Sequence, residues 1–321
     1  MKTHFAPTTA FIGIDVASKE LVINLYGQDK TLALPNTRAS ISRWLATLSD
    51  NAVIAVEATG SYHELLLTLA HARGLGCYLL NPKDVRHYAH GVGQRSKTDH
   101  VDAQLIARYL AKEHEHLHQW KPASEASRLL ARLLGRRAKL VSYKSAMKKS
   151  LGDLPELRAQ LKTVLEKIDR LIREIERRIP AALAALPEGK AQSERLRQIP
   201  GVGPLTAAML TNVFSRVPFT RVDAVVAFAG MDPRANDSGA KRGRRRLSKR
   251  GPSELRRLLY NAAMAASKSA LWKPFYERER RKGLPTTAAL NVLARRLLRL
   301  AFTLFRTQSD FDPNVVKNTC A

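Results

Sequence analysis

The chain has 321 residues, 45% of them hydrophobic, which is enough to bury a sizeable core and, by the usual size of domains, to form about two domains. Its 54 Lys and Arg against 28 Asp and Glu give a net charge of +26, which predicts a polyanionic partner, nucleic acid first of all. Two cysteines exclude a disulfide framework and a zinc cluster, and no apolar stretch approaches the roughly 20 residues of a membrane span. We therefore expect a cytoplasmic protein with no membrane partner.

Short apolar runs rich in Val and Ile predict five strands in the first third of the chain, with amphipathic helices between them. The expected strands are 11–17, 21–26, 31–34, 52–58 and 77–80, and the clearest helices are 41–48 and 62–73. Three successive strands followed by alternating helix and strand indicate an α/β domain with a mixed sheet, covered by helices. This order suits a ribonuclease-H-like fold over residues 1–120.

Acidic side chains follow two of these buried runs. Asp15 comes directly after residues 11–14, and Glu57 comes directly after residues 53–56. A carboxylate at the end of a buried strand costs free energy unless a cation compensates it. With Asp99 and Asp102 further along the chain, four such groups predict a divalent metal site, although each acid alone also fits an ordinary turn or helix start.

A helix is expected over residues 98–112, with Thr98 as its N-cap. Asp99 and Asp102 are three residues apart and are continued by Ile106 and Tyr109, so we expect both acids on one inward-facing side. Acids in a first helical turn also lie near the positive end of the helix dipole, which favours their charged form.

Residues 121–190 are helical and charged, and are expected to link two domains. Apolar residues recur at alternating steps of four and three, which predicts a short coiled-coil seam that ends at Pro180; the seam residues are Leu157, Leu161, Val164, Ile168, Leu171 and Ile175. Gly152 and Pro155 separate this helix from the one before it. An antiparallel hairpin within one chain and pairing between two chains both fit this pattern.

A helical domain is expected over residues 191–308, before a polar tail at 309–321. Residues 196–208 resemble a helix-hairpin-helix element, in which Gly201 and Gly203 would bring bare backbone amides against a phosphate. A plain turn between two helices is the alternative. Two further helices, 252–271 and 286–306, combine apolar stripes with arginines.

A strongly basic segment follows Asn236-Asp237-Ser238-Gly239. We expect it to bind nucleic-acid phosphates through Lys241, Arg242, Arg244, Arg245, Arg246, Lys249 and Arg250. Asp-Ser-Gly by itself is only a turn, but nearby cations or a metal would activate the Ser238 hydroxyl as a nucleophile. The net charge rises along the chain, from +2 for residues 1–110 to +8 for 111–190 and +16 for 191–321. The nearly neutral first part contains the four acids, whereas the two later parts are suited to binding phosphates.

Taken in order, these motifs resemble the insertion-sequence transposases of the DEDD class, the one-hundred-and-ten group, which is related to the Piv-type DNA invertases. The resemblance covers nearly the whole chain. Its motifs are Ile12-Gly13-Ile14-Asp15, Glu57-Ala58-Thr59-Gly60, Asn81-Pro82, Lys97-Thr98-Asp99, Asp102-Ala103, Ile199-Pro200-Gly201-Val202-Gly203, Phe228-Ala229-Gly230, Ser238-Gly239 and Leu255-Arg256-Arg257.

The resemblance implies a RuvC-like domain in which Asp15, Glu57, Asp99 and Asp102 hold magnesium (Mg²⁺), and a transposase domain whose Ser238 attacks DNA. It also implies a structured noncoding bridge RNA that pairs with donor and target DNA, and a homo-oligomer, dimer or tetramer. Two other functions fit the residues: a metal-dependent nuclease or junction resolvase that uses activated water, and a non-catalytic nucleic-acid-binding protein.

Overall fold

The computed structural model describes residues 9–58, 60–94, 98–234, 243 and 245–314. The chain forms two compact units, residues Met1–Pro122 and Ala123–Ala321, and each is described by itself. Across the described residues, no helix is both long and apolar enough to span a membrane.

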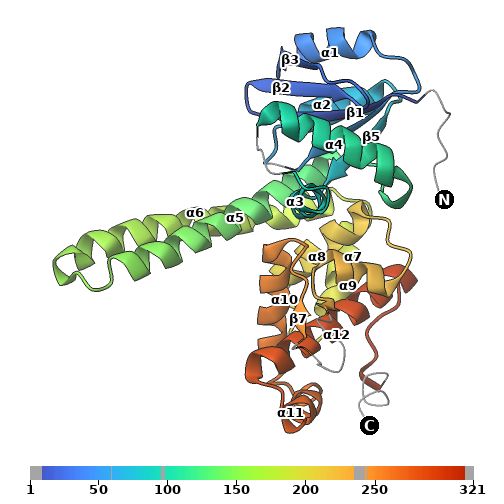
Figure 1. The fold of residues 1–321 in the computed structure, drawn as a ribbon. Coiled ribbons are helices and arrows are strands. Elements are labelled where there is room, and N and C mark those ends of the chain that lie inside the picture. The colour runs from blue at the N-terminus through green and yellow to red at the C-terminus, as the bar shows by residue number, and fades with distance from the viewer. Residues whose placement is uncertain (1–8, 59, 95–97, 235–242, 244, 315–321) are drawn as a thin grey trace. The chain divides into compact units, whose positions relative to one another are not determined.

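The first unit is built on a five-stranded sheet with the strand order β3-β2-β1-β4-β5 (Figure 1). Its strands are β1 (Phe11–Val16), β2 (Glu20–Leu25), β3 (Thr31–Pro35), β4 (Val53–Glu57) and β5 (Gly76–Leu80). The first three strands pair antiparallel, whereas β4 runs parallel to β1 and β5 parallel to β4. The predicted strands and the mixed sheet are therefore confirmed.

Helices cover both faces of this sheet. Because side chains alternate along a strand, Ile12 and Ile14 of β1 point to one face, where they join the core formed with α1 (Arg38–Ala46) and α2 (Glu64–Ala72). On the opposite face, Val53 and Ala55 of β4 pack with α3 (Pro82–Gly91) and α4 (Asp99–Glu113). The α/β prediction for this part of the chain is correct.

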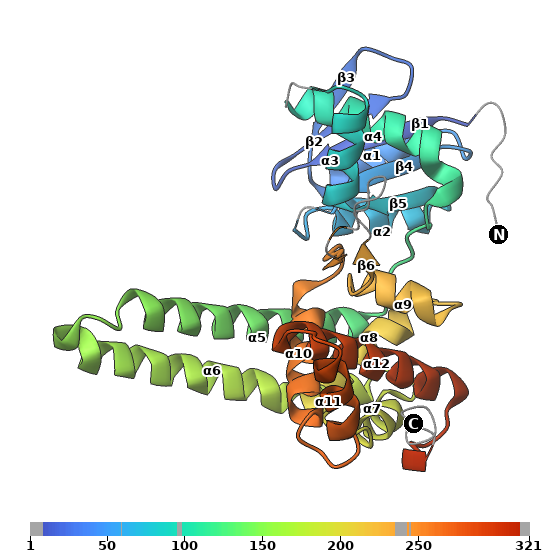
Figure 2. The ribbon, with the colours of Figure 1, turned by 60° about the horizontal axis from the view of Figure 1, so that its bottom comes forward.

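The second unit begins with two long helices, α5 (Glu125–Ser150) and α6 (Arg158–Ala184), joined by a short 3₁₀ turn, η2 (Pro155–Leu157). They lie side by side as an antiparallel hairpin (Figure 2). Two ion pairs fix their register, from Arg137 to Glu176 at 2.7 Å and from Lys144 to Asp169 at 2.6 Å. Within one chain, these helices thus follow the hairpin alternative.

Helix α6 continues through Pro180 to Ala184, within the helical stretch expected to residue 190, because burial of Ile179 and Leu183 compensates for the backbone hydrogen bond that the proline cannot donate. The predicted seam is wrong in part. The helix also buries Ile172, whereas Val164 and Leu171 of the predicted seam are 40% and 56% exposed.

The remaining helices surround a second core that includes Leu259, Trp272 and Leu297. They are α7 (Gly189–Arg197), α8 (Pro204–Arg216), α9 (Val222–Phe228), α10 (Ser253–Ala266), α11 (Lys273–Arg281) and α12 (Thr286–Thr307). The expected helix over 252–271 ends early, because the Ser269 hydroxyl donates to Ala266 O and accepts from Trp272 N, which closes a turn. The helix predicted at 286–306 is confirmed as α12.

Candidate active site

Asp15 and Glu57 lie on neighbouring parallel strands. In the register of β1 and β4, Ile14 pairs with Val56, so the next step along both strands sets Asp15 beside Glu57. By strand alternation both side chains share the face of Gly13 and Ala55, which α4 covers. Each acid is half-buried. The sheet thus places the first two carboxylates together at the carboxyl ends of its central strands.

Helix α4 runs antiparallel to β1. Near the start of the strand, the rings of Phe11 and His114 lie 5.0 Å apart, so the last turn of α4 lies over the first residue of β1. Two residues further along β1, Gly13 lies against Ala103 and Ala107 in the middle of the helix. Moving along β1 toward Asp15 therefore means moving along α4 toward its N-terminus.

Gly13 allows this helix to approach the sheet closely. A Cβ atom at Gly13 would lie 2.1 Å from Ala107 N and 2.3 Å from Ala103 O, where no side chain fits. From Gly13 to Asp15 the strand rises about 6.6 Å, and from Ala103 back to Asp99 the helix rises about 6 Å. The two rises match, so the packing carries the first turn of α4 to the same end of the sheet as Asp15.

Thr98 caps α4 as expected, accepting a hydrogen bond from Val101 N at 3.3 Å. Asp102 is half-buried and precedes the buried Ala103, but Asp99 is exposed. The expectation that both acids face inward is therefore wrong for Asp99, because it is the first residue of the helix and lies a full turn before the contact at Ala103.

The four acids do not form a closed ligand cluster. Among the side chains that the structure describes, no group of three or more His, Cys, Asp or Glu lies close enough to hold a metal ion. The donor set nonetheless fits a hard divalent cation, since Mg²⁺ prefers carboxylate oxygens, often only one or two of them with water and substrate phosphate completing the shell. Asp15 and Glu57 on the sheet supply such a pair, and the first turn of α4 faces the same end.

The segment that carries Ser238 lies between two short strands of the second unit. Strand β6 (Pro233–Arg234) pairs antiparallel with β7 (Arg246–Leu247), so residues 235–245 connect one strand to the next. Ser238 lies outside the described residues, as do the expected phosphate-binding residues Lys241, Arg242 and Arg244. The described basic residues of this segment are exposed: Arg245, Arg246, Lys249 and Arg250.

The base of this β6–β7 hairpin is held by one backbone hydrogen bond and by the side chain of Arg256. Lys249 N donates to Gly230 O at 3.0 Å, and the Arg256 guanidinium donates to Ala229 O at 3.1 Å and to Gly251 O at 2.5 Å. Partial burial lowers the pKa of Arg256, yet an arginine stays charged at neutral pH. The connection that carries Ser238 therefore starts and ends at fixed positions.

A second serine lies in the same hairpin. Ser248 donates its hydroxyl hydrogen to the Asp232 carboxylate. A carboxylate that accepts from a hydroxyl is a recognised way to position a nucleophile, so Ser248 is a competitor for the role assigned to Ser238.

The two glycines of the helix-hairpin-helix-like element differ in their surroundings. Gly201 has φ +97°, and a Cβ there would lie 2.5 Å from Ala262 O, so this glycine is required for packing against α10. Gly203 caps α8, and among the described atoms nothing lies within 4 Å of the position its Cβ would take. Of the two, Gly203 is the one with room for a phosphate at a helix N-terminus.

Sequence reasoning gave Gly13 no role of its own. Its signal was nevertheless present, since a glycine inside the apolar run Phe11-Ile12-Gly13-Ile14 indicates a place where another backbone approaches closely.

Comparison with known proteins identifies the family of the chain. A family model described as a DEDD transposase of the IS110 group matches residues 12–179, from β1 through most of α6. A second model, described as the transposase IS116/IS110/IS902 family, matches residues 193–277.

Individual relatives align over most of their length. A pilin gene-inverting protein of Moraxella bovis is 27% identical over 82% of each chain. A probable family 20 transposase of Pseudomonas aeruginosa is 24% identical over 94% of this chain and 98% of its own. The transposase for insertion sequence element IS1111A of Coxiella burnetii is 26% identical over 81% of each. Since the first model alone matches more than half of the residues, the chain belongs to the IS110 family of transposases, enzymes of DNA transposition and recombination.

Proposed function

We propose that this transposase cuts and rejoins DNA through a covalent phosphoserine bond on Ser238, assisted by a divalent metal ion held by Asp15, Glu57, Asp99 and Asp102 in a RuvC-like domain. The observation that carries the proposal is the antiparallel packing of α4 on β1, which directs the first turn of the helix to the end of the sheet where Asp15 and Glu57 lie. The mixed strand order and the family membership support it further.

The serine step needs no nucleotide cofactor, because each bond that forms is matched by one that breaks. The Ser238 oxygen forms a bond to phosphorus, the bond from phosphorus to one deoxyribose oxygen breaks, and the serine proton passes to that leaving oxygen. A hydroxyl of another strand then reverses the step. One phosphodiester is exchanged for another of similar energy, in accord with the absence of a GxxxxGK[ST] loop in the sequence.

When bound, a divalent ion would neutralise charge on the scissile phosphate and help to orient its attacking and leaving oxygens. The exposed Arg245, Arg246 and Lys249 would hold the DNA backbone beside Ser238 without reading its sequence. Target choice is assigned to a bridge RNA, because guided systems leave base reading to pairing and bind duplex geometry through basic surfaces. Since two DNA partners must each be cut and rejoined, the working form is an oligomer, either a dimer or a tetramer.

A trapping experiment tests the covalent step. Wild-type protein is incubated with Mg²⁺ and labelled DNA that carries the ends of its own element, then denatured and resolved by electrophoresis. We expect a labelled adduct that disappears in Ser238→Ala and in Asp15→Asn but persists in Ser267→Ala, a half-buried control serine in the second unit whose hydroxyl donates to Met264 O. Loss of the adduct in Ser248→Ala but not in Ser238→Ala would move the nucleophile to Ser248.

Two assays separate the alternatives. In the trapping experiment, cleaved DNA without any adduct would indicate a nuclease that uses activated water. In a plasmid recombination assay, activity that survives loss of all four acids would indicate a binding protein that assists another enzyme. For RNA guidance, sequencing of copurified nucleic acid should give one discrete noncoding RNA from the element, and a random sample of cellular RNA would reject it.

A further inference from the structure

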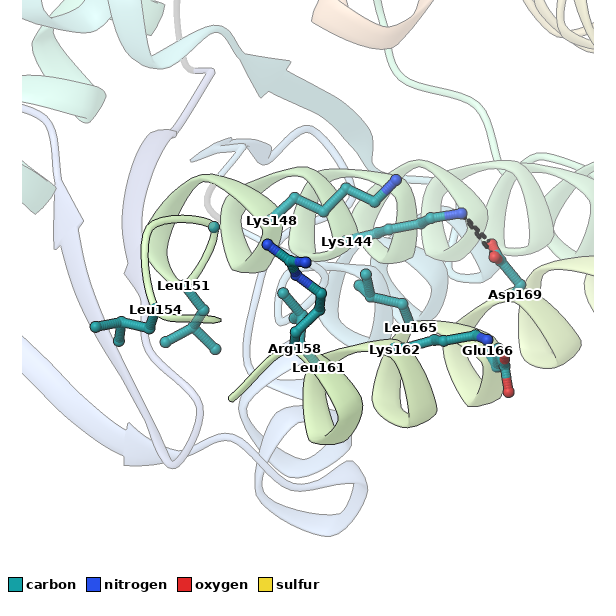
Figure 3. A pocket seen from close by; sticks show the side chains of 11 residues that line it. Lys144, Lys148, Leu151, Leu154, Arg158, Leu161, Lys162, Leu165, Glu166 and Asp169 are labelled. Atoms are coloured by element: carbon teal, nitrogen blue, oxygen red, sulfur yellow. Dashed lines mark hydrogen bonds and ion pairs between the residues drawn. The ribbon is translucent and has the colours of Figure 1, made fainter. Parts of the chain in front are cut away.

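A cavity of about 510 Å³ lies at the tip of the α5–α6 hairpin, where the two helices separate (Figure 3). Its volume falls in the range of pockets that hold small ligands, about 300–1,000 Å³. It is lined by the last turns of α5, by the connection at residues 152–154, and by the first turns of α6.

The lining combines apolar surface with positive charge. Four partly exposed leucines supply the apolar part: Leu151, Leu154, Leu161 and Leu165. The charged lining residues are four Lys and Arg against two acids, Glu166 and Asp169. A ligand that covers these partly exposed leucines is stabilised by about 25 cal/mol for each Å² of apolar surface that it removes from water.

Two exposed cations, Lys148 and Arg158, line the cavity. Lys144 is already paired with Asp169, whose pKa is lowered chiefly by that hydrogen bond. By contrast, Lys148 and Arg158 are exposed, and the Arg158 side chain rises from α6 toward α5 (Figure 3). A ligand that satisfies this site has an anionic group for the cations and a flat apolar face for the leucines.

We propose that the tip cavity binds an unpaired nucleotide of a nucleic acid, with its phosphate at Lys148 and Arg158 and its base on the leucines. An unpaired nucleotide offers both groups at once, whereas a duplex hides its base faces by stacking. This site depends on the proposed function only in requiring that the protein binds nucleic acid. It extends the proposed function, because the hairpin would contact single-stranded RNA or DNA directly.

The test is binding by full-length protein, measured by fluorescence anisotropy in EDTA so that no strand is cut. The probes are a uridine dodecamer, a thymidine dodecamer and a duplex of equal length. One variant combines Lys148→Gln with Arg158→Gln. Its control combines Lys149→Gln with Arg170→Gln, which removes the same charge from exposed residues of the same hairpin outside the cavity lining.

We expect the cavity variant to lower the slope of log K against log salt by roughly 0.7, because one single-strand phosphate contact is lost. Over the tenfold range from 1 M to 0.1 M salt this corresponds to roughly fivefold weaker binding. The control should bind within about twofold of wild type, and Leu154→Ser should weaken single-strand binding without changing the salt slope. Thermal denaturation verifies that each variant is folded.

If both double variants lose the same affinity, the effect comes from overall charge and the proposal is wrong. It is also wrong if the cavity variant loses the same affinity for duplex as for single strands. A uridine probe carrying 4-thiouridine should cross-link to residues 151–165, and cross-links elsewhere would also refute it. A loss confined to the uridine or the thymidine probe identifies RNA or DNA as the ligand. Because nothing is cleaved, the result is independent of whether Ser238 forms a covalent bond.

Discussion

The replacement of Gly13 by alanine tests the close packing of α4 on the sheet. The added Cβ would lie 2.1 Å from Ala107 N, and ordinary contacts begin near 3.4 Å, so the helix must move by about 1.3 Å. Overpacking of this kind costs about 1–3 kcal/mol in the free energy of unfolding. A displacement of about 1 Å at a reacting centre lowers rates by roughly 100-fold. We expect Gly13→Ala to lower both the Tm and recombination.

Thermal denaturation and a plasmid recombination assay measure the two effects separately. Gly91→Ala is the matched control, because among the described atoms nothing lies within 4 Å of its Cβ position and its φ is not left-handed. It should leave both measurements unchanged or raise the Tm slightly. If Gly13→Ala recombines within twofold of wild type at a temperature where it is folded, the position of α4 does not control the acidic site and our reasoning fails.

Three further predictions concern the rest of the molecule. Ser127→Ala removes the hydroxyl that donates a 2.7 Å hydrogen bond to the buried Asn212 Oδ1. Urea denaturation should therefore show that the free energy of unfolding falls by about 1–3 kcal/mol, and a fall of less than about 0.5 kcal/mol would contradict this. Because Lys144 lowers the pKa of Asp169 below its ordinary 3.8, the carboxylate stabilises the hairpin above that pH and ceases to do so as pH falls through the lowered pKa. The Tm difference between wild type and Asp169→Asn should therefore be present at about pH 7 and shrink at about pH 2, and a constant difference would exclude this origin. Burial raises the pKa of Cys77 to about 12, so its thiol is unreactive in the folded protein. In a Cys320→Ser background, a thiol reagent at about pH 8 should label Cys77 only after unfolding. Rapid labelling of the native protein would show that the thiol is accessible.

The sequence predicted the sheet well because each strand contains a short run of apolar residues. The runs 11–14 and 53–56 mark both a strand and the acid that comes directly after the run, Asp15 or Glu57. The succession of strands and helices along the chain, the cap at Thr98 and the start of α4 followed from equally local signals. These features depend on neighbouring residues, which a sequence displays directly.

Other features depend on contacts between distant residues. The exposure of Asp99 and the burial of Ile172 in place of Leu171 are set by which partner each helix faces, and the heptad count alone does not determine that. Continuation of α6 past Pro180 likewise depends on what Ile179 and Leu183 bury against. Propensity argued for a break, and tertiary packing outweighed it.

The uneven distribution of charge gives the acidic site a physical role. A carboxylate pair at the end of the sheet repels a DNA backbone, whereas the basic residues of the second unit attract it. Under the proposed function, a divalent ion between carboxylates and phosphate would remove the repulsion only where the acids lie, so metal and DNA binding would favour one another there. The net charge of +2 for residues 1–110 gives that region little nonspecific attraction for DNA, while the net charge of +16 for residues 191–321 gives more. In the proposed function, affinity and chemistry are thus divided between different parts of the chain, and the half-buried Asp15, Glu57 and Asp102 would couple the two.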